Sequence, residues 1–123
     1  IDMVATDHAP HTAEEKARAF AKAPSGITGL ETAFSVCNTF LVQTGRLSPM
    51  QLVARMSRTP AELYGLSGRA VRAGNFARLV LLDWKRETVH RSYRSKAANT
   101  PYTGMPLTGA PRAIVTGTKV TAR

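Results

Sequence analysis

A carboxylate and two imidazoles lie within five residues of one another near the start of the chain, in the run Thr6-Asp7-His8-Ala9-Pro10-His11. Side chains of these types commonly move protons or bind metal ions in enzymes. Pro10 lacks a backbone donor and restricts the residue before it, so the run is expected to form a shaped loop. Asp7 and His11 can then face the same mouth, which predicts a proton-handling or metal-binding site.

The residues that precede this run are expected to position it. Residues 3–5 are apolar and predict a short buried strand within residues 1–6. In a (β/α)8 barrel the loop after a strand lies at the C-terminal rim, where catalytic groups gather. Residues 7–28 are expected to form a long loop, with a helical turn within residues 13–21.

Residues 29–66 are expected to be helical. An apolar set recurs with the helical period: Leu30, Ala33, Phe34, Cys37, Phe40 and Leu41. Gly45 is placed to end this helix, and Ser48 followed by Pro49 predicts the N-terminus of the next one. Thr59 and Glu62 have the spacing of a capping box, which predicts a third N-terminus. Gly65 and Gly68 are expected to end that helix.

Residues 69–123 are expected to be rich in β-structure. Residues 77–83 predict a strand that is too apolar for an exposed edge. Residues 113–115 and 119–121 predict a hairpin around Gly117. Between these elements, an irregular connection is expected from four turn-forming residues: Gly104, Pro106, Gly109 and Pro111.

Composition narrows the classes of protein. The net charge of +9 comes from 17 Lys and Arg spread along 123 residues, without a recognised nucleic-acid motif. This favours solvated or paired charges over a nucleic-acid surface, so no nucleic-acid partner is expected. The single cysteine, Cys37, fits a reducing cytoplasmic setting and is expected to be a small core residue rather than a nucleophile. No apolar run is long enough for a membrane span. Because the chain begins at Ile1 and its first strand follows at once, we expect a part of a longer protein.

The run from Thr6 to His11 resembles the last active-site motif of the dihydroorotases, which are members of the amidohydrolase superfamily. The resemblance continues through residues 12–16, 23–33, 95–96 and 99–102 and covers the C-terminal third of such an enzyme. It implies an α/β fold: the C-terminal portion of a (β/α)8 amidohydrolase barrel, with its last strand and helices, in residues 1–67. Strands of a small β-sandwich domain follow in residues 68–123, and N-terminal strands of the enzyme complete that sandwich.

The resemblance also implies roles for particular residues. Asp7 would contact a catalytic metal ion and handle a proton, and His11 would donate a hydrogen bond to the substrate carboxylate. Ser25 and Gly26 would offer backbone groups to the substrate, although Ser25 stands where relatives commonly have phenylalanine. From the residues alone, Asp7 could instead cap the turn over Ala9 or Pro10, His11 could be a surface-loop histidine, and 25–26 an ordinary turn. For His8 a structural hydrogen bond is favoured over metal ligation.

The activity implied is the metal-dependent, reversible cyclisation of N-carbamoyl-L-aspartate to L-dihydroorotate in pyrimidine synthesis. One or two Zn²⁺ ions would serve, with most ligands in the remainder of the parent chain, because the His-x-His pair of the superfamily is absent here. The chain alone is therefore expected to be inactive. The other partners implied are the small-molecule substrate and either a second copy or an aspartate carbamoyltransferase. Two alternatives stay open: a non-catalytic scaffold for that transferase, and a hydantoinase or allantoinase.

Overall fold

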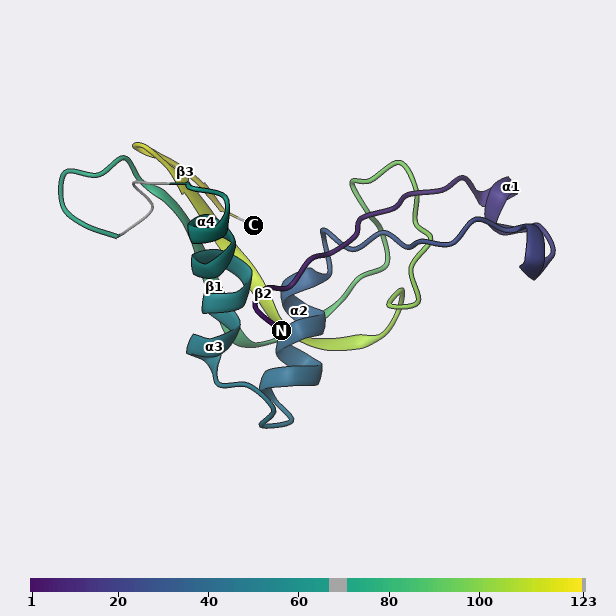
Figure 1. Cartoon of the computed structure of the whole chain (residues 1–123), viewed down its shortest axis with the longest axis horizontal. Helices are drawn as coiled ribbons and strands as arrows, with labels where there is room; N and C mark the ends of the chain where they lie inside the picture. The colour runs from purple at the N-terminus through teal and green to yellow at the C-terminus, as the bar shows by residue number, and fades with distance from the viewer. Residues whose placement is uncertain (67–70, 123) are drawn as a thin grey trace.

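The computed structural model describes residues 1–66 and 71–122 (Figure 1). Its helices are α1 (Ala13–Lys16), the short 3-10 helix η1 (Phe20–Lys22), α2 (Ala33–Cys37), η2 (Asn38–Val42), α3 (Pro49–Val53), η3 (Ala54–Arg58) and α4 (Thr59–Leu63). Its strands are β1 (Arg78–Val89), β2 (Pro106–Thr116) and β3 (Lys119–Ala122). The expected domain boundary between residues 67 and 68, and Gly68 as a helix end, lie outside the described residues.

The helices from α2 to α4 and the strands form one body, from which two long segments extend together. The helices from α2 to α4 lie beside the sheet, and residues 5–28, which include α1 and η1, run away from it, with α1 near their far end (Figure 1). The loop between β1 and β2 extends in the same direction (Figure 1). Backbone contacts such as Thr28 N–H to the Asn99 carbonyl, at 3.0 Å, confirm that the two loops lie side by side.

The sheet is antiparallel, with the strand order β1-β2-β3. The predicted hairpin is confirmed: Thr116 pairs with Lys119, and Gly117 takes the positive φ of 58° that the tight turn requires. The expected irregular connection was wrong beyond its first residues, because β2 begins at Pro106. A register shift accommodates the proline inside the strand, since Pro111 pairs with Leu82 while Ala113 pairs with Leu81.

Strand β1 runs further than the apolar segment that predicts it. It continues to Val89, with a register shift after Asp83, whose Oδ1 accepts hydrogen bonds from the amides of Lys85 and Arg86 at 3.1 Å. Among the described residues β1 pairs only with β2 and forms one edge of the sheet. Its Val80 and Leu81 side chains are exposed, so the apolar character of this strand is not buried by the described residues.

The buried strand expected at residues 3–5 does not form. The Val4 amide donates to the Arg55 carbonyl at 3.1 Å, and Arg55 Nε donates to the Ile1 carbonyl at 3.3 Å. The described neighbour of this segment is thus helix η3, which cannot offer the repeating ladder that a strand needs. Ala5 is exposed, and Met3 and Val4 are only half-buried.

The first long helix consists of α2 and η2. It does not bury the face formed by the apolar residues that recur with the helical period. Leu30 and Phe40 are 63% and 43% exposed, whereas Ser35 and Asn38 are fully buried. Small polar residues lie against the sheet because they can approach a strand closely while their side chains satisfy its backbone groups.

Hydrogen bonds attach this helix to the sheet. Ser35 Oγ donates to the Gly109 carbonyl at 2.7 Å, and Asn38 Nδ2 donates to the carbonyls of Thr108 and Trp84 at 2.8 and 3.0 Å. The buried apolar residues are few among those described: Leu52, Leu107 and Ala110. Polar contacts therefore supply much of the specificity of this packing.

The ends of the helices can be compared with the predicted caps and stops. Gly45 follows the first helix with φ 74°, and Ser48 caps the second, both as predicted. The capping box that Ser48 forms with Gln51 was not predicted. The predicted N-terminus at Thr59 is wrong, because Thr59 and the preceding Arg58 have helical φ and ψ and the helix continues from Pro49 to Leu63. Glu62 Oε1 accepts a hydrogen bond from Arg58 Nε at 2.7 Å instead of reaching back to Thr59.

Cys37 is half-buried in this helix, and burial raises the pKa of its thiol. A raised pKa keeps the thiol protonated at neutral pH, which suits the predicted packing role. Among the described residues, every helix is too short or too polar to cross a membrane.

Replacing Gly109 with alanine is expected to destabilise the protein. Gly109 has φ 99°, and a Cβ there would lie 2.7 Å from Asn38 Nδ2 and 2.9 Å from Phe34 Cε1. The matched control is Gly45→Ala, because Gly45 also has a positive φ but open space around it. Urea unfolding should show Gly109→Ala to be less stable than Gly45→Ala by about 1–3 kcal/mol, the usual cost of overpacking. Equal losses would mean that only backbone strain matters at Gly109.

Candidate functional site

Two loop segments, residues 6–11 and 25–30, run side by side at the start of α2. His8 and Ile27 form a parallel bridge, and the Ala9 amide donates to the Ile27 carbonyl at 2.8 Å. The segments also touch at Gly29, where a Cβ would lie only 2.9 Å from the Thr6 carbonyl oxygen. Glycine is therefore needed for this close approach.

His8 joins the two segments through its ring. Its Nδ1 accepts hydrogen bonds from the amides of Gly29 at 3.1 Å and Leu30 at 3.4 Å. Because amides only donate, Nδ1 is unprotonated. The structural hydrogen-bonding role predicted for His8 is confirmed.

Asp7 lies between these contacts with its side chain exposed. It is the one described residue other than glycine with a positive φ, 41°, a conformation that aspartate tolerates better than most residues. No described group donates a hydrogen bond to its carboxylate. The turn-capping alternative is wrong, because the Ala9 amide is committed to Ile27 and Pro10 has no amide hydrogen. The loop thus presents a free carboxylate on a backbone that is held on both sides.

His11 is held on three sides. Its ring Nε2 lies 3.0 Å from the Ser25 carbonyl oxygen, and because a carbonyl only accepts, Nε2 carries the hydrogen. Its Nδ1 lies 3.5 Å from Glu15 Oε2, and its amide donates to Asn99 Oδ1 at 3.1 Å. The structure therefore brings the predicted residues His11 and Ser25 together.

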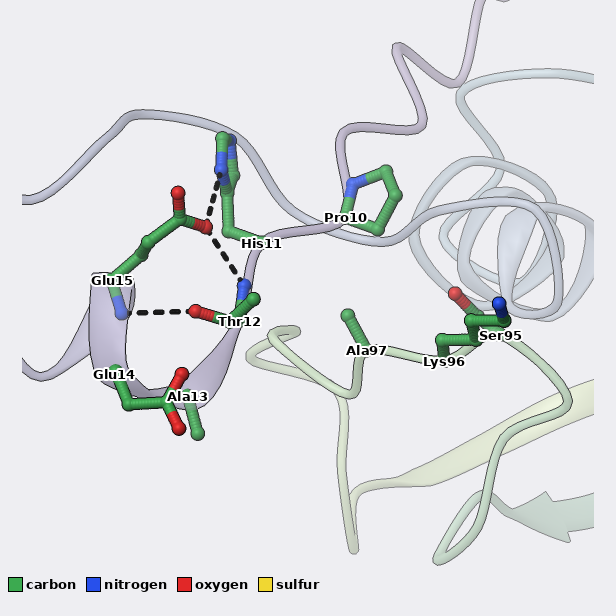
Figure 2. A pocket seen from close by; sticks show the side chains of 9 residues that line it. All are labelled: Pro10, His11, Thr12, Ala13, Glu14, Glu15, Ser95, Lys96 and Ala97. Atoms are coloured by element: carbon green, nitrogen blue, oxygen red, sulfur yellow. Dashed lines mark hydrogen bonds and ion pairs between the residues drawn. The ribbon is translucent and has the colours of Figure 1, made fainter.

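Helix α1 supports His11 from one side. Thr12 and Glu15 form a capping box, in which the Thr12 amide donates to Glu15 Oε2 at 3.0 Å and the Glu15 amide donates to Thr12 Oγ1 at 3.2 Å (Figure 2). The Thr12 amide, and then His11 and Arg18, hold the pKa of the Glu15 carboxyl below its ordinary value. Glu15 is therefore ionised at neutral pH beside His11. The Thr-x-x-Glu spacing of Thr12 and Glu15 is the sequence signal for this helix start.

Gly26 is fixed by contacts to its carbonyl. This oxygen accepts hydrogen bonds from Asn99 Nδ2 and Lys16 Nζ, both at 3.2 Å. Gly26 has φ 120°, and a Cβ there would lie 2.6 Å from Ala9 Cβ, so only glycine fits. Its amide has no acceptor among the described residues.

Three positioning residues were not predicted. Asn99 bonds to both loop segments, and Lys16 Nζ also donates to the Pro24 carbonyl at 2.9 Å. The Glu31 carboxylate accepts from the amides of Arg94 and Ser95 at 2.9 to 3.0 Å. Asn99 and Glu31 lie in segments that carry the family resemblance, but their local sequence gives no hint of these distant contacts.

A pocket of about 510 Å³ lies beside this loop, with residues 10–15 on one side and residues 95–97 on the other. Figure 2 shows the His11–Glu15–Thr12 contacts on one side of it and Ser95 and Lys96 across from them. Of the predicted site residues only His11 lines it; Asp7, Ser25 and Gly26 do not. The pocket is therefore the seam between α1 and the segment that carries Asn99.

The described residues do not make a metal centre on their own. Nowhere in residues 1–66 and 71–122 do three His, Cys, Asp or Glu side chains gather closely enough to hold an ion. A catalytic zinc site usually needs about three protein ligands. Asp7 has a free carboxylate and can supply one of them.

Comparison with known proteins identifies relatives of this chain. No protein-family model matches it. It is 50% identical over 111 residues to a dihydroorotase of Caldanaerobacter subterraneus subsp. tengcongensis, which covers 89% of this chain and 26% of the relative. It is 41% identical over 122 residues to a dihydroorotase of Bacillus thuringiensis, covering 98% of this chain and 28% of the relative. A solved L-hydantoinase (dihydropyrimidinase) from Arthrobacter aurescens superposes on the whole chain with a TM-score of 0.89 and 35% identity, over 29% of its own length. The chain thus spans about a quarter of the curated relatives it matches.

Proposed function

We propose that this chain forms part of a dihydroorotase. The proposal is supported by its relation to the dihydroorotases and by a fold like the matching part of amidohydrolase-family chains. The predicted α/β fold class is confirmed by the match to those chains over its whole length. The division into the end of a barrel (1–67) and strands of a sandwich domain (68–123) is part of the proposal. The curated dihydroorotases are 41–50% identical to it, whereas the hydantoinase is 35% identical, which favours dihydroorotase over the hydantoinase alternative.

The whole protein would interconvert N-carbamoyl-L-aspartate and L-dihydroorotate in pyrimidine synthesis. In the ring-opening direction a water oxygen bonds to the ring carbonyl carbon, the carbon–nitrogen bond breaks, and the nitrogen gains a proton. Asp7 would take the proton from the water and return it to the leaving nitrogen. The observation that carries this proposal is the exposed Asp7 carboxylate, free of described hydrogen-bond donors, on a fixed backbone with φ 41°.

The neighbouring residues would bind the substrate. With a hydrogen on both ring nitrogens, His11 would donate from Nδ1 to the substrate carboxylate while Nε2 keeps its contact with Ser25. The Nδ1 contact to Glu15, at 3.5 Å, is long and exchangeable, whereas the Nε2 contact to Ser25 is short. The free Gly26 amide would donate to a substrate carbonyl. Ser25 would act mainly by holding His11 through its carbonyl, so the loss of the usual phenylalanine leaves that contact intact.

A zinc ion, or a pair of them, fits this proposal only with ligands from the remainder of the parent chain. Asp7 would be the ligand that this chain supplies. When bound, zinc acidifies a water so that it can attack at neutral pH. The cytoplasmic location, and a second copy or an aspartate carbamoyltransferase as protein partner, belong to the proposal as well. A non-catalytic scaffold for that transferase is a second alternative.

The whole protein is expected to turn over dihydroorotate and N-carbamoyl-L-aspartate, and the 123-residue chain alone is expected to turn over neither. The reason is that zinc needs about three protein ligands and this chain is proposed to supply one. Steady-state assays with zinc added, run beside hydantoin and allantoin, test the activity and the substrate class together. An inactive whole protein that binds aspartate carbamoyltransferase would support the scaffold instead. Turnover by the chain alone, above a zinc-only blank, would contradict the assignment of the missing ligands.

A further inference from the structure

We propose that Asn99 is a positioning residue that holds the two segments of the substrate loop together, and so sets the placement of His11 and Gly26. This inference rests on the proposed function, because it assigns those two residues to the substrate. Asn99 itself is proposed to take no part in the chemical step, and it lies in the loop that joins β1 to β2.

The contacts of Asn99 reach both segments at once. Its Oδ1 accepts from the His11 amide at 3.1 Å, and its Nδ2 donates to the carbonyls of Ala9 at 3.3 Å and Gly26 at 3.2 Å. Its own backbone carbonyl accepts from the Thr28 amide at 3.0 Å. One side chain therefore bonds to three backbone groups that are far from it in the sequence.

The chemistry of the amide suits these three partners. An asparagine side chain has an acceptor oxygen and two N–H donors, and here the oxygen meets an amide and the donors meet two carbonyls. An aspartate of the same shape would keep the acceptor for His11, but it would place an oxygen against the carbonyls of Ala9 and Gly26. Alanine would remove all three side-chain bonds without that repulsion.

The segment that carries Asn99 is itself anchored. The Glu31 carboxylate, just before α2, accepts from the amides of Arg94 and Ser95, and the Thr100 amide donates to the Ala98 carbonyl at 2.9 Å. The position of Asn99 is thus fixed relative to the start of α2, close to the point where His8 bonds to Gly29. The loop and its support form one hydrogen-bonded unit.

None of the three side-chain bonds of Asn99 goes to Asp7. Loss of these bonds should therefore displace the substrate-binding groups more than the carboxylate that handles the proton. In the whole enzyme we expect Asn99→Asp to raise KM for dihydroorotate about 10-fold or more, with kcat lowered by less than about 3-fold. Asn99→Ala should lie between this variant and wild type. These fold-changes correspond to the loss of two or three hydrogen bonds of ordinary net strength.

Asn38→Asp is a matched control. Asn38 Nδ2 also donates to two carbonyls, those of Thr108 and Trp84, so this variant creates the same repulsion between a helix and the sheet. It should lower Tm while leaving KM unchanged at temperatures where the protein is folded. A similar rise of KM in both variants would overturn the proposal, because Asn99 would then act only through stability. Unchanged KM in an active Asn99→Asp enzyme would also overturn it.

Amide exchange tests the same point without turnover. Asn99→Ala should speed exchange of the His11 amide at least about 10-fold relative to Asn38→Ala, because its acceptor is gone. The Thr28 amide, which bonds to the backbone of residue 99, should change less. If wild type shows no turnover of dihydroorotate, the proposed function fails, and this exchange pattern still decides the positioning role: faster exchange at His11 supports it, and equal exchange in the two variants overturns it.

Discussion

Asp7→Asn in the whole enzyme is expected to remove nearly all turnover, with kcat lowered by about 10²–10⁴-fold or more, the usual share of positioned proton transfer. Asparagine keeps the shape of the side chain but cannot accept the proton from water. Further loss would come from a weaker contact with the metal ion. Steady-state kinetics in both directions, together with the zinc content of the purified variant, measure the effect.

Asparagine is the informative replacement because of the backbone at this position. Asp7 has φ 41°, and asparagine tolerates that conformation about as well as aspartate, whereas alanine would add strain. No described group bonds to the carboxylate, so Tm should stay near that of wild type. Asp2→Asn, an exposed carboxylate in the same segment, is the control and should keep full activity. A near-normal kcat in Asp7→Asn would contradict the proton-handling role.

His11→Ala is expected to raise KM for dihydroorotate by about 10- to 150-fold, from the loss of a hydrogen bond to a charged group worth about 1.5–3 kcal/mol. The variant also removes the contact between Nε2 and the Ser25 carbonyl, which helps to hold the Gly26 loop. The effect on kcat should be smaller unless the contact aligns the ring for attack.

Dihydrouracil, which lacks the carboxylate, separates these two contributions. If His11 binds the carboxylate, the preference of wild type for dihydroorotate over dihydrouracil should be mostly lost in His11→Ala. Glu14→Ala is the control, since Glu14 is exposed on helix α1, which follows His11, and has no described contact with His11. A preserved preference in His11→Ala, with both substrates weakened equally, would assign His11 to loop support rather than to the carboxylate.

Features that depend on neighbouring residues were predictable. The stop of the first helix at Gly45, the start of the next helix at Ser48-Pro49 and the hairpin at Gly117 were all confirmed, because capping and tight turns are satisfied by groups a few residues apart. The run from Asp7 to His11 also identified the loop in which the structure holds His8, His11 and Gly26 together.

Features that depend on distant partners were mispredicted. Residues 3–5 have strand composition but meet a helix, and Thr59 has a capping sequence inside a continuous helix. The first helix buries Ser35 and Asn38 rather than the apolar residues that recur with the helical period. The reason is that the close approach to Gly109 selects small polar side chains. A local sequence pattern indicates which helices and strands are possible, but tertiary packing decides which of them form.

The sequence by itself determined the kind of chemistry available: a carboxylate and imidazoles after a short apolar segment, in a run that resembles one family. Only the tertiary structure decided how that loop is held. Asn99 lies 88 residues from His11 and 90 from Ala9 along the chain, yet its amide bonds to both. No periodicity or spacing encodes such a pair, because hydrogen bonds between loops depend on the complete path of the backbone between them.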